Sequence, residues 1–201
     1  RSSTVAWPVR SFPGYFHDIA AADEQITGST SFINTAEASA VTETVAWLEQ
    51  QGVLLADIGV IAMYGDQVRL IKSMRPELRV STVDAYQGQE CDFIIISFVR
   101  GTPGQSLLFL ESPQRLNVAL TRCRRGRICI GNAKVLSQGT VVRSIVEHHR
   151  QQGVLVTGRR TGVLTVAAST ASTTLCAEST ADVAAHPIQH VGAGDEAAVT
   201  E

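Results

Sequence analysis

Short apolar runs and longer amphipathic stretches alternate along residues 15–152. The apolar runs, several of them rich in β-branched residues, predict strands at Tyr15–Ile19, Ile58–Met63, Arg79–Val83, Phe93–Val99 and Ile128–Ile130. The stretches with three- and four-residue apolar spacing predict helices from Asn34 to Gly52, at Tyr64–Lys72, from Ser112 to Cys123 and at Val141–Gln152. Strands that alternate with helices predict a parallel sheet with helices on both faces, and therefore an α/β fold.

Two of the predicted helices begin with typical capping residues. Asn34-x-x-Glu37 has the capping-box pattern, which satisfies free backbone N–H groups at the start of a helix. Ser112 and Pro113 are typical of an N-cap and a first helical position. The helix that follows carries apolar side chains that we expect to face the core: Leu116, Ala119, Leu120 and Cys123.

Length and composition favour one globular domain followed by a segment of different character. The 201 residues are 44% hydrophobic and 18% charged, a balance that allows a sizeable core without disulfides or metals. From Thr161 onward there is no Lys or Arg, and Ala, Ser, Thr and Val dominate. Such a composition buries too little apolar surface to offset the entropy of ordering. We therefore expect a lead-in at 1–14, an α/β domain at 15–158 and a largely disordered tail at 159–201.

The sequence argues against membrane and secreted classes. Its longest apolar run, Phe93–Val99, is far too short to span a bilayer, and no signal-peptide pattern follows Arg1. The four cysteines form no CxxC pair and the five histidines are scattered, which favours reduced, packed thiols and argues against a metal site. We expect an intracellular protein, cytoplasmic or nuclear. Because the chain does not begin with Met, we also expect an excerpt or a truncated product.

Residues 80–92 (VSTVDAYQGQECD) form a polar connection between two apolar predicted strands. Open α/β sheets bind ligands at the carboxyl edge of their strands, and we expect this connection to lie there. Gly and Asp are also ordinary turn residues, so Asp84 and Gly88 fit a plain surface connection equally well. The residues by themselves leave both interpretations open.

Residues 115–127 (RLNVALTRCRRGR) concentrate positive charge beside a predicted helix. Arg115 and Arg122 are seven positions apart, and we expect them on nearly the same helix face. Guanidinium groups fixed there would hold phosphate oxygens and would stay charged at physiological pH. The alternative is a solvated basic face, or arginines that pair with Glu111 and other carboxylates.

Four segments together resemble superfamily-one helicases of the up-frameshift (regulator of nonsense transcripts) type. In chain order they are residues 31–38 (SFINTAEA), 58–67 (IGVIAMYGDQ), 80–100 (VSTVDAYQGQECDFIIISFVR) and 115–124 (RLNVALTRCR). The first is similar to the family's S-x-x-N-x-x-E-A segment, the second to the segment that runs into motif IV, and the last two to motifs V and VI. Two positions depart from the family pattern, Met63 where Pro is common and Cys123 where Ala is usual. The resemblance covers roughly residues 15–150, in the expected order.

The resemblance implies the second of two RecA-like domains in an ATP-driven helicase or translocase. In such enzymes ATP and Mg²⁺ lie between the domains, and the first domain supplies the phosphate-binding loop and the magnesium carboxylates. By its place in motif VI, Arg122 is the arginine finger that stabilises charge on the transferred phosphoryl group, and Arg115 supports the site. Glu90 matches the motif V acid that reaches the nucleotide at its ribose, while Gln87 and Gly88 shape that approach.

The same resemblance implies a track for nucleic acid. Ser81, Thr82 and Tyr64 are the candidates for contacts to the backbone of single-stranded RNA or DNA. Asp84 is expected to hold the motif V turn rather than to take part in chemistry. With aromatic residues at 5% of the chain, no stacking platform for bases stands out.

Essential parts of such an ATPase do not occur in the sequence. No G-x-x-x-x-G-K-[ST] segment is present, and no acidic pair of the motif II kind is recognisable. We therefore expect negligible ATP hydrolysis by this chain alone and a need for a phosphate-loop domain in cis or in trans. The alternative is a non-catalytic RecA-like module that binds nucleic acid or protein. A free-standing enzyme for a small molecule lacks support, since no nucleophile triad or dinucleotide fingerprint occurs.

Overall fold

The computed structural model describes residues 5–158 together with Thr165 and Val166. All of these residues fall within one structural unit, Arg1–Thr170. The predicted disordered tail, residues 159–201, therefore lies outside the described residues except for Thr165 and Val166.

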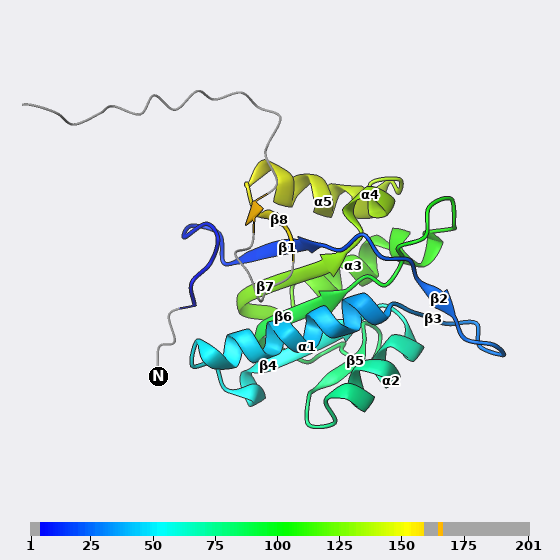
Figure 1. The fold of residues 1–201 in the computed structure, drawn as a ribbon. Coiled ribbons are helices and arrows are strands. Elements are labelled where there is room, and N and C mark those ends of the chain that lie inside the picture. The colour runs from blue at the N-terminus through cyan, green and yellow to red at the C-terminus, as the bar shows by residue number, and fades with distance from the viewer. Residues whose placement is uncertain (1–4, 159–164, 167–201) are drawn as a thin grey trace, which may run out of the picture. The chain divides into compact units, whose positions relative to one another are not determined.

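A seven-stranded sheet forms the centre of the fold (Figure 1). In spatial order its strands are β5 (Val80–Thr82), β4 (Ile58–Ala62), β6 (Cys91–Ser97), β7 (Cys123–Gly131), β1 (Gly14–Asp18), β8 (Leu155–Thr157) and β9 (Thr165–Val166). The first six strands run parallel, and β9 pairs antiparallel with β8. The predicted α/β fold with a RecA-like parallel sheet is confirmed.

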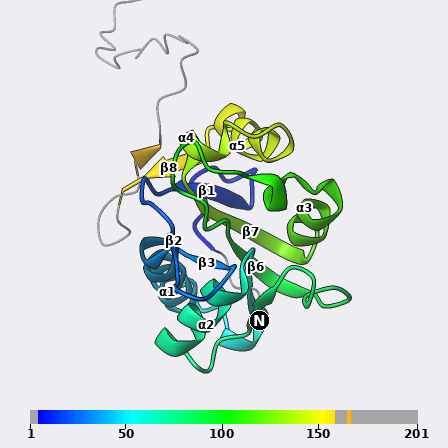
Figure 2. The same cartoon turned by 90° about the vertical axis from the view of Figure 1, so that its right-hand side faces the viewer.

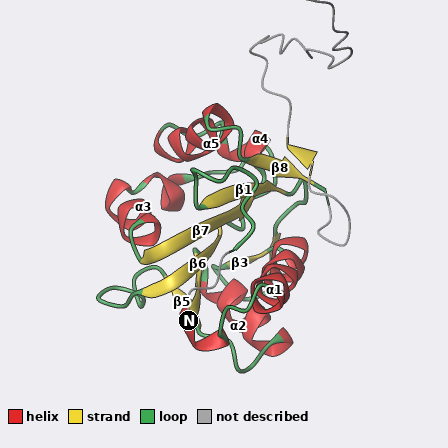
Figure 3. Ribbon diagram, turned by 90° about the vertical axis from the view of Figure 1, so that its left-hand side faces the viewer, coloured by secondary structure: helices red, strands yellow, loops and turns green. Residues whose placement is uncertain are grey.

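Helices cover both faces of the sheet (Figure 3). On one face lie α1 (Thr35–Gln50) and α2 (Gly65–Met74), and on the other α3 (Pro113–Leu120), α4 (Ala133–Leu136) and α5 (Val141–Gln151). The side chains of β6 alternate between the two layers: Ile94 and Ile96 pack toward α3–α5, whereas Phe93 and Ile95 pack toward α1 and α2. A central strand of such a sheet is therefore apolar on both faces, as β6 is from Phe93 to Ile96.

Short elements lie beyond the carboxyl ends of the strands, the end of the sheet that faces the viewer in Figure 2. The antiparallel hairpin of β2 (Glu24–Gln25) and β3 (Phe32–Ile33) follows β1, and the 3₁₀ turn η2 (Leu108–Glu111) precedes α3. A second 3₁₀ turn, η1 (Leu55–Asp57), leads into β4 at the opposite end. The connections at the carboxyl ends are thus the longer ones.

Both predicted helix starts are confirmed. Asn34 is the N-cap of α1, where its Oδ1 accepts the N–H of Glu37 at 3.1 Å. Ser112 caps α3, where its Oγ accepts the N–H of Arg115 at 3.4 Å. The second half of the capping box is replaced, since the Asn34 N–H donates to Gln67 Oε1 at 2.8 Å and leaves the Glu37 carboxyl for other partners.

Two predicted elements differ from the structure. α3 ends at Leu120, so Cys123 begins a strand and does not belong to the apolar stripe of the helix. β7 has nine residues, of which the sequence pattern predicted three. The first half of this strand carries the exposed Arg124 and Arg125, and its sequence therefore has no apolar pattern.

Candidate functional site

Because its strands are parallel, the sheet has an amino edge, where the strands begin, and a carboxyl edge, where they end. Thr82 is the last residue of β5 and Ser97 the last residue of β6. Both are register partners of Ala62 in β4, so the two strands end at the same height in the sheet. The connecting segment 83–90 must therefore return along the sheet before β6 begins. Asp84 lies at the carboxyl edge and Glu90 at the amino edge. The prediction that the whole connection sits at the carboxyl edge is wrong for its second half.

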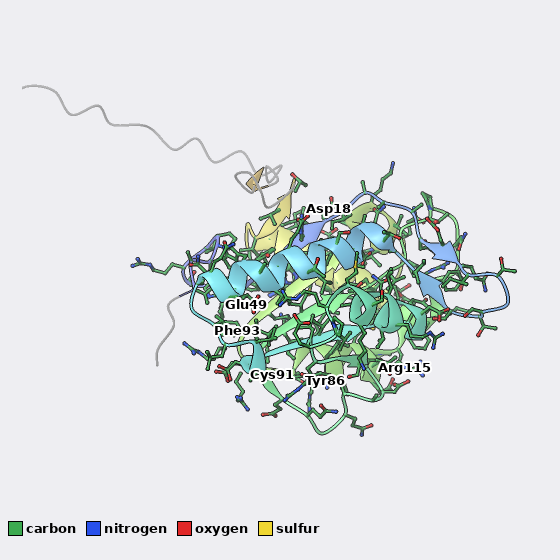
Figure 4. The ribbon with its side chains drawn as sticks, turned by 60° about the horizontal axis from the view of Figure 1, so that its bottom comes forward. Asp18, Glu49, Tyr86, Cys91, Phe93 and Arg115 are labelled. Atoms are coloured by element: carbon green, nitrogen blue, oxygen red, sulfur yellow. The ribbon has the colours of Figure 1, made fainter. Side chains whose placement is uncertain are left out.

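Helix α3 separates the two candidate arginines in the same way. Arg115 lies in the first turn of the helix. The helix ends at Leu120, and Arg122 is the residue immediately before β7. The prediction that Arg115 and Arg122 share a helix face is wrong, because the helix stops before the second arginine. Arg115 belongs to the carboxyl edge and Arg122 to the amino edge. In Figure 4, Arg115 and Cys91, the first residue of β6, lie at different ends of the sheet.

At the amino edge, Glu90 and Arg122 stand at the starts of neighbouring strands. The Cys91 N–H donates to the Arg122 carbonyl oxygen at 3.1 Å. Cys91 and Cys123 are register partners of β6 and β7. Glu90 and Arg122 each precede one member of this pair. The structure therefore brings the predicted nucleotide-binding acid and the predicted arginine finger to one place.

The Arg122 side chain is oriented but not neutralised. Its Nε donates to the Val118 carbonyl oxygen at 3.2 Å, and its Nη2 donates to Thr121 Oγ1 at 3.0 Å. The side chain is partly exposed and forms no ion pair within the part of the chain that the structure describes. A guanidinium has five N–H donors, so these two bonds leave others for an anionic ligand.

The neighbouring arginines of the amino edge are compensated by a carboxylate. Arg124 Nη2 lies 2.8 Å from Asp92 Oδ1, and this interaction raises the pKa of Arg124. Arg125 Nη1 lies 3.8 Å from Asp92 Oδ2, and its guanidinium carbon is 5.6 Å from the centre of the Phe93 ring. Of these three neighbouring arginines, Arg122 is therefore the one best placed to receive an external anion.

At the carboxyl edge, Arg115 is engaged with nearby side chains. Its Nε donates to Asp84 Oδ1 at 3.1 Å, and its guanidinium carbon lies 4.2 Å from the centre of the Phe109 ring. The two charged side chains are 37% and 62% exposed, so the ion pair contributes little stability. It does join the start of segment 83–90 to α3. This contact agrees with the expectation that Asp84 holds the turn.

Between the two edges, segment 83–90 has exposed polar residues and a buried tyrosine that anchors it to the sheet. Gln87 and Gly88 are exposed, and Gly88 has a φ of +80°, which a residue with a side chain rarely adopts. Tyr86 is buried, and its hydroxyl donates to Cys91 Sγ at 3.0 Å. Figure 4 shows Tyr86 and Cys91 next to each other. The buried ring, together with the buried Val83, fixes a segment whose remaining side chains are exposed.

The three candidates for nucleic-acid contacts lie together at the carboxyl edge. Tyr64 lies two residues after the end of β4 and is the N-cap of α2, and Ser81 and Thr82 are the last residues of neighbouring β5. Thr82 Oγ1 accepts the Ala85 N–H at 3.4 Å. The Ser81 hydroxyl is buried and has no hydrogen-bond partner among the described residues. These three residues lie at the opposite edge from Arg122.

A row of aromatic rings, Phe32–Tyr64–Phe109, runs along the carboxyl edge. The ring centres are 5.4 Å apart for the first pair and 5.2 Å for the second. The Arg100 guanidinium lies 3.9 Å from the centre of the Phe32 ring, and Arg115 covers Phe109, so each end has a cation–π contact. Sequence reasoning missed this aromatic row, because the three rings come from distant segments of a chain with few aromatic residues.

A buried carboxyl group supports the backbone of the same edge. Glu37 of α1 is inaccessible to solvent, and its Oε2 accepts the Ser97 hydroxyl at 2.7 Å and the Val99 N–H at 2.9 Å. Burial raises the pKa of Glu37 to about 8. Val99 has a φ of +74°, a strained value for a β-branched residue. The hydrogen bond that Val99 donates to Glu37 thus stabilises the sharp turn that follows β6.

A buried ion pair fixes the chain leading to the β2–β3 hairpin. Asp23 Oδ2 lies 2.5 Å from Arg100 Nη1, and Asp23 Oδ1 accepts the N–H groups of Gly101 and Thr102 at 2.8 and 2.7 Å. Burial opposes ionisation, but these bonds and the Arg100 charge lower the pKa of Asp23 overall. Asp23 is therefore held as an anion, and its ion pair fixes Arg100, which covers the Phe32 ring of the aromatic row.

Other features lie away from these residues. A cavity of about 300 Å³ opens at the end of β1, where His17, Asp18 and Glu43 contribute to its wall. The described residues contain no group of three or more His, Cys, Asp or Glu that could hold a metal ion. Within the same part of the chain, no helix combines the length and apolar character needed to cross a membrane.

Residues 2–134 match the model of the family described as "AAA domain". The chain belongs to this family. It is 39% identical over 167 residues to "Regulator of nonsense transcripts 1" of Dictyostelium discoideum, an alignment that covers 78% of this chain and 12% of that protein. It is 35% identical over 168 residues to "ATP-dependent helicase NAM7" of Saccharomyces cerevisiae, with 78% and 17% covered. It is 36% identical over 163 residues to "ATP-dependent helicase upf1" of Schizosaccharomyces pombe, with 76% and 18% covered.

This AAA-domain chain therefore spans less than a fifth of the length of these relatives. The similarity extends over about three quarters of the chain. The resemblance to up-frameshift helicases that the motif segments indicated is confirmed as homology, and it supports a helicase domain.

Proposed function

We propose that this chain is the second RecA-like motor domain of an ATP-dependent RNA or DNA helicase or translocase. The observation that carries the proposal is Arg122, which is partly exposed at the amino edge, oriented, unpaired with any described carboxylate, and next to Glu90. The homology to ATP-dependent helicases supports ATP as the nucleotide. The complete motor also needs a domain with a phosphate-binding loop, in the same protein or on a partner.

The residues of the amino edge fit a nucleotide. Arg122 has guanidinium N–H groups available for phosphate oxygens, as an arginine finger requires. It would stabilise the negative charge that develops on the transferred phosphoryl group. Glu90 has an exposed carboxylate that can accept hydrogen bonds from ribose hydroxyls, and the exposed Gln87 and Gly88 shape the approach.

Mg²⁺ bound with ATP would neutralise phosphate charge. The acidic residues of the amino edge do not form a cluster of metal ligands, and Asp92 is already paired with Arg124. We therefore assign the protein ligands of Mg²⁺, together with the phosphate cradle, to the first domain. Arg115 acts here as a positioning residue, because its contact with Asp84 fixes one end of segment 83–90 while Glu90 ends the other.

The carboxyl edge is the proposed track for single-stranded RNA or DNA. Tyr64, Ser81 and Thr82 would contact the backbone, because hydroxyls and N–H groups can bind phosphates without reading sequence. The aromatic row adds partly exposed aromatic surface beside these residues. Segment 83–90 and α3 each connect this edge with the amino edge, so nucleotide and nucleic acid are linked through both. Such a motor is expected inside the cell, in cytoplasm or nucleus.

The test is reconstitution of ATP hydrolysis. The full chain is combined, in trans or as a fusion, with a phosphate-loop RecA-like domain taken from a relative, and turnover of Mg-ATP is measured. Arg122→Ala is expected to lower the rate by about 10³-fold, the usual value of an arginine finger. Arg124→Ala is the matched control, because it removes an arginine of the same edge whose charge is already paired with Asp92. A reconstituted rate that survives Arg122→Ala would contradict the proposal.

The second candidate is a non-catalytic RecA-like module that binds nucleic acid or protein. It rests on the carboxyl edge, where Tyr64 and the hydroxyl-bearing Ser81 and Thr82 lie together. This candidate uses the carboxyl edge alone and gives Arg122 no role. It would be supported if the chain bound single strands but stimulated no hydrolysis with any phosphate-loop domain.

A further inference from the structure

Two cysteines are neighbours across the strands of the amino edge. Cys91 of β6 and Cys123 of β7 are register partners in a parallel pair, and both are free thiols. Neighbouring strands lie about 4.8 Å apart. A disulfide bridges Cα atoms separated by about 4.4–6.8 Å. The regular strand spacing therefore falls within the range that a bond between the two sulfurs requires, and the pairing becomes irregular only beyond this pair, between Cys91 and Phe93.

Both side chains lie on the same side of the sheet. Cys91 belongs to the apolar cluster between the sheet and α3–α5, and Cys123 packs against that cluster. Cys91 Sγ accepts hydrogen bonds from Tyr86 Oη at 3.0 Å and Arg79 Nη1 at 3.2 Å. Cys123 Sγ lies 3.9 Å from the Leu120 carbonyl oxygen. Hydrogen bonds to sulfur are weak, so pairing would replace these contacts as the two side chains rotate about their Cα–Cβ bonds.

The cysteines of this region differ in access to solvent. Cys123 is partly exposed, whereas Cys91 is 2% exposed. Cys129 lies further along β7, is fully buried, and burial raises its pKa to about 11. A small oxidant from solvent therefore reaches Cys123 first and finds Cys91 as the neighbouring thiol.

We propose that Cys91 and Cys123 form a reversible disulfide when the protein meets hydrogen peroxide. The Cys123 sulfur attacks the peroxide, so that an S–O bond forms, the O–O bond breaks and one water leaves. The Cys91 sulfur then attacks the Cys123 sulfur, so that the S–S bond forms and the S–O bond breaks with loss of a second water. Two thiols give up two electrons and two protons, which reduce one peroxide to two waters. Two molecules of a small thiol such as glutathione then reduce the disulfide back to two thiols and become a disulfide themselves.

The disulfide would join the starts of β6 and β7 covalently. Glu90 and Arg122 directly precede the two cysteines, so oxidation would fix these residues relative to each other. Formation of the bond depends on strand register and access alone. The proposal of a disulfide can therefore be tested independently of the nucleotide-binding role proposed for Glu90 and Arg122.

Peptide mapping of the full chain tests the proposal. The folded protein is treated with hydrogen peroxide, its remaining thiols are alkylated, and it is digested with trypsin without reductant. Each cysteine lies on its own tryptic peptide: Cys91 in 80–100, Cys123 in 123–124, Cys129 in 128–134 and Cys176 in 161–201. We expect peptide 80–100 linked to peptide 123–124, and loss of this species after dithiothreitol.

Two variants and a second measurement sharpen the result. Cys129→Ala should keep the link, and Cys123→Ala should abolish it and leave Cys91 open to alkylation after denaturation. Oxidation should also raise the midpoint of thermal unfolding of wild type but not of Cys123→Ala, because a disulfide restricts the unfolded chain. A link from 80–100 to another cysteine peptide, or two thiols that both stay alkylatable after peroxide, overturns the proposal. Wild type alone decides this outcome, whether or not a variant folds.

Discussion

The carboxyl group of Glu37 holds the backbone at the end of β6, where Ser97 and Val99 donate hydrogen bonds to it. It is fully buried and surrounded by donors, the Ser97 hydroxyl, the Val99 N–H and, at 3.5 Å, the Asn34 amide. Burial outweighs these donors and raises the pKa of Glu37 from 4.5 to about 8. At neutral pH the folded chain therefore holds a proton on Glu37 that the unfolded chain has released.

The free energy of unfolding is therefore expected to fall as the pH rises from about 5 to about 8. Glu37 contributes its full stabilisation below the unfolded pKa of 4.5 and has lost it once the pH passes the folded pKa of about 8. Each pH unit within this window removes up to about 1.4 kcal/mol. Urea unfolding of wild type and Glu37→Gln across this range measures the effect, and the variant should lack this part of the pH dependence.

The comparison with Glu37→Gln also controls for other titrating groups. Burial lowers the pKa of His149 to about 4, so His149 contributes stability that grows as the pH rises toward 6.5. That contribution is present in both proteins and cancels in their difference. Parallel curves of stability against pH for the two proteins would refute a raised pKa for Glu37.

Among the secondary-structure elements, β4 needs a glycine at position 59 so that Tyr86 of segment 83–90 can pack against the strand. A Cβ at Gly59 would collide with the Tyr86 hydroxyl and lie 3.0 Å from Ile94 Cδ1. Gly59→Ala is therefore expected to lower the free energy of unfolding by about 1–3 kcal/mol, as overpacking does. Gly65→Ala is the matched control, because a Cβ at the start of α2 meets no atom within 4 Å. Urea unfolding compares them, and a Gly59→Ala chain as stable as the control would show that Tyr86 does not need this space.

Elements with a full hydrophobic period could be predicted from the sequence, and the others could not. β6 has an unbroken apolar run from Phe93 to Ile96, because both of its faces are buried. α1 has apolar steps and an N-cap, because one face of the helix is buried. β7 was predicted only in part, since Arg124 and Arg125 leave its first half without an apolar pattern. The β2–β3 hairpin has two-residue strands, which are too short to show any period.

At the scale of the whole molecule, the sequence supplies candidate site residues but not their arrangement. Family resemblance identified Glu90 and Arg122 as candidates, while their meeting at the amino edge follows from the register of β6 and β7. The distinction between Arg122 and Arg124 likewise depends on Asp92, which pairs with only one of them. Such pairings are tertiary contacts between distant segments. Local patterns of charge and hydrophobicity do not encode them.

Charge is also divided unevenly along the whole molecule. No Lys or Arg follows Thr170, whereas five acidic residues do: Glu178, Asp182, Asp195, Glu196 and Glu201. Removing residues 171–201 therefore changes the net charge from −2 to +3 and keeps the unit Arg1–Thr170, β9 included. Repulsion between like charges acts over about 10 Å at 0.1 M salt. The shortened chain is therefore expected to bind single-stranded RNA several-fold more tightly than the full chain at low salt.

Fluorescence anisotropy with a labelled oligonucleotide, repeated over a series of salt concentrations, measures this difference. The difference in affinity between the two chains should shrink as salt rises, because the screening length falls to about 3 Å at 1 M. Contacts to phosphates weaken over the same range. A full-length chain with the five acidic residues changed to Asn or Gln is the matched control, because it alters charge without altering length. We expect this control to bind like the shortened chain. If it binds like wild type instead, the 31 removed residues act through something other than their charge.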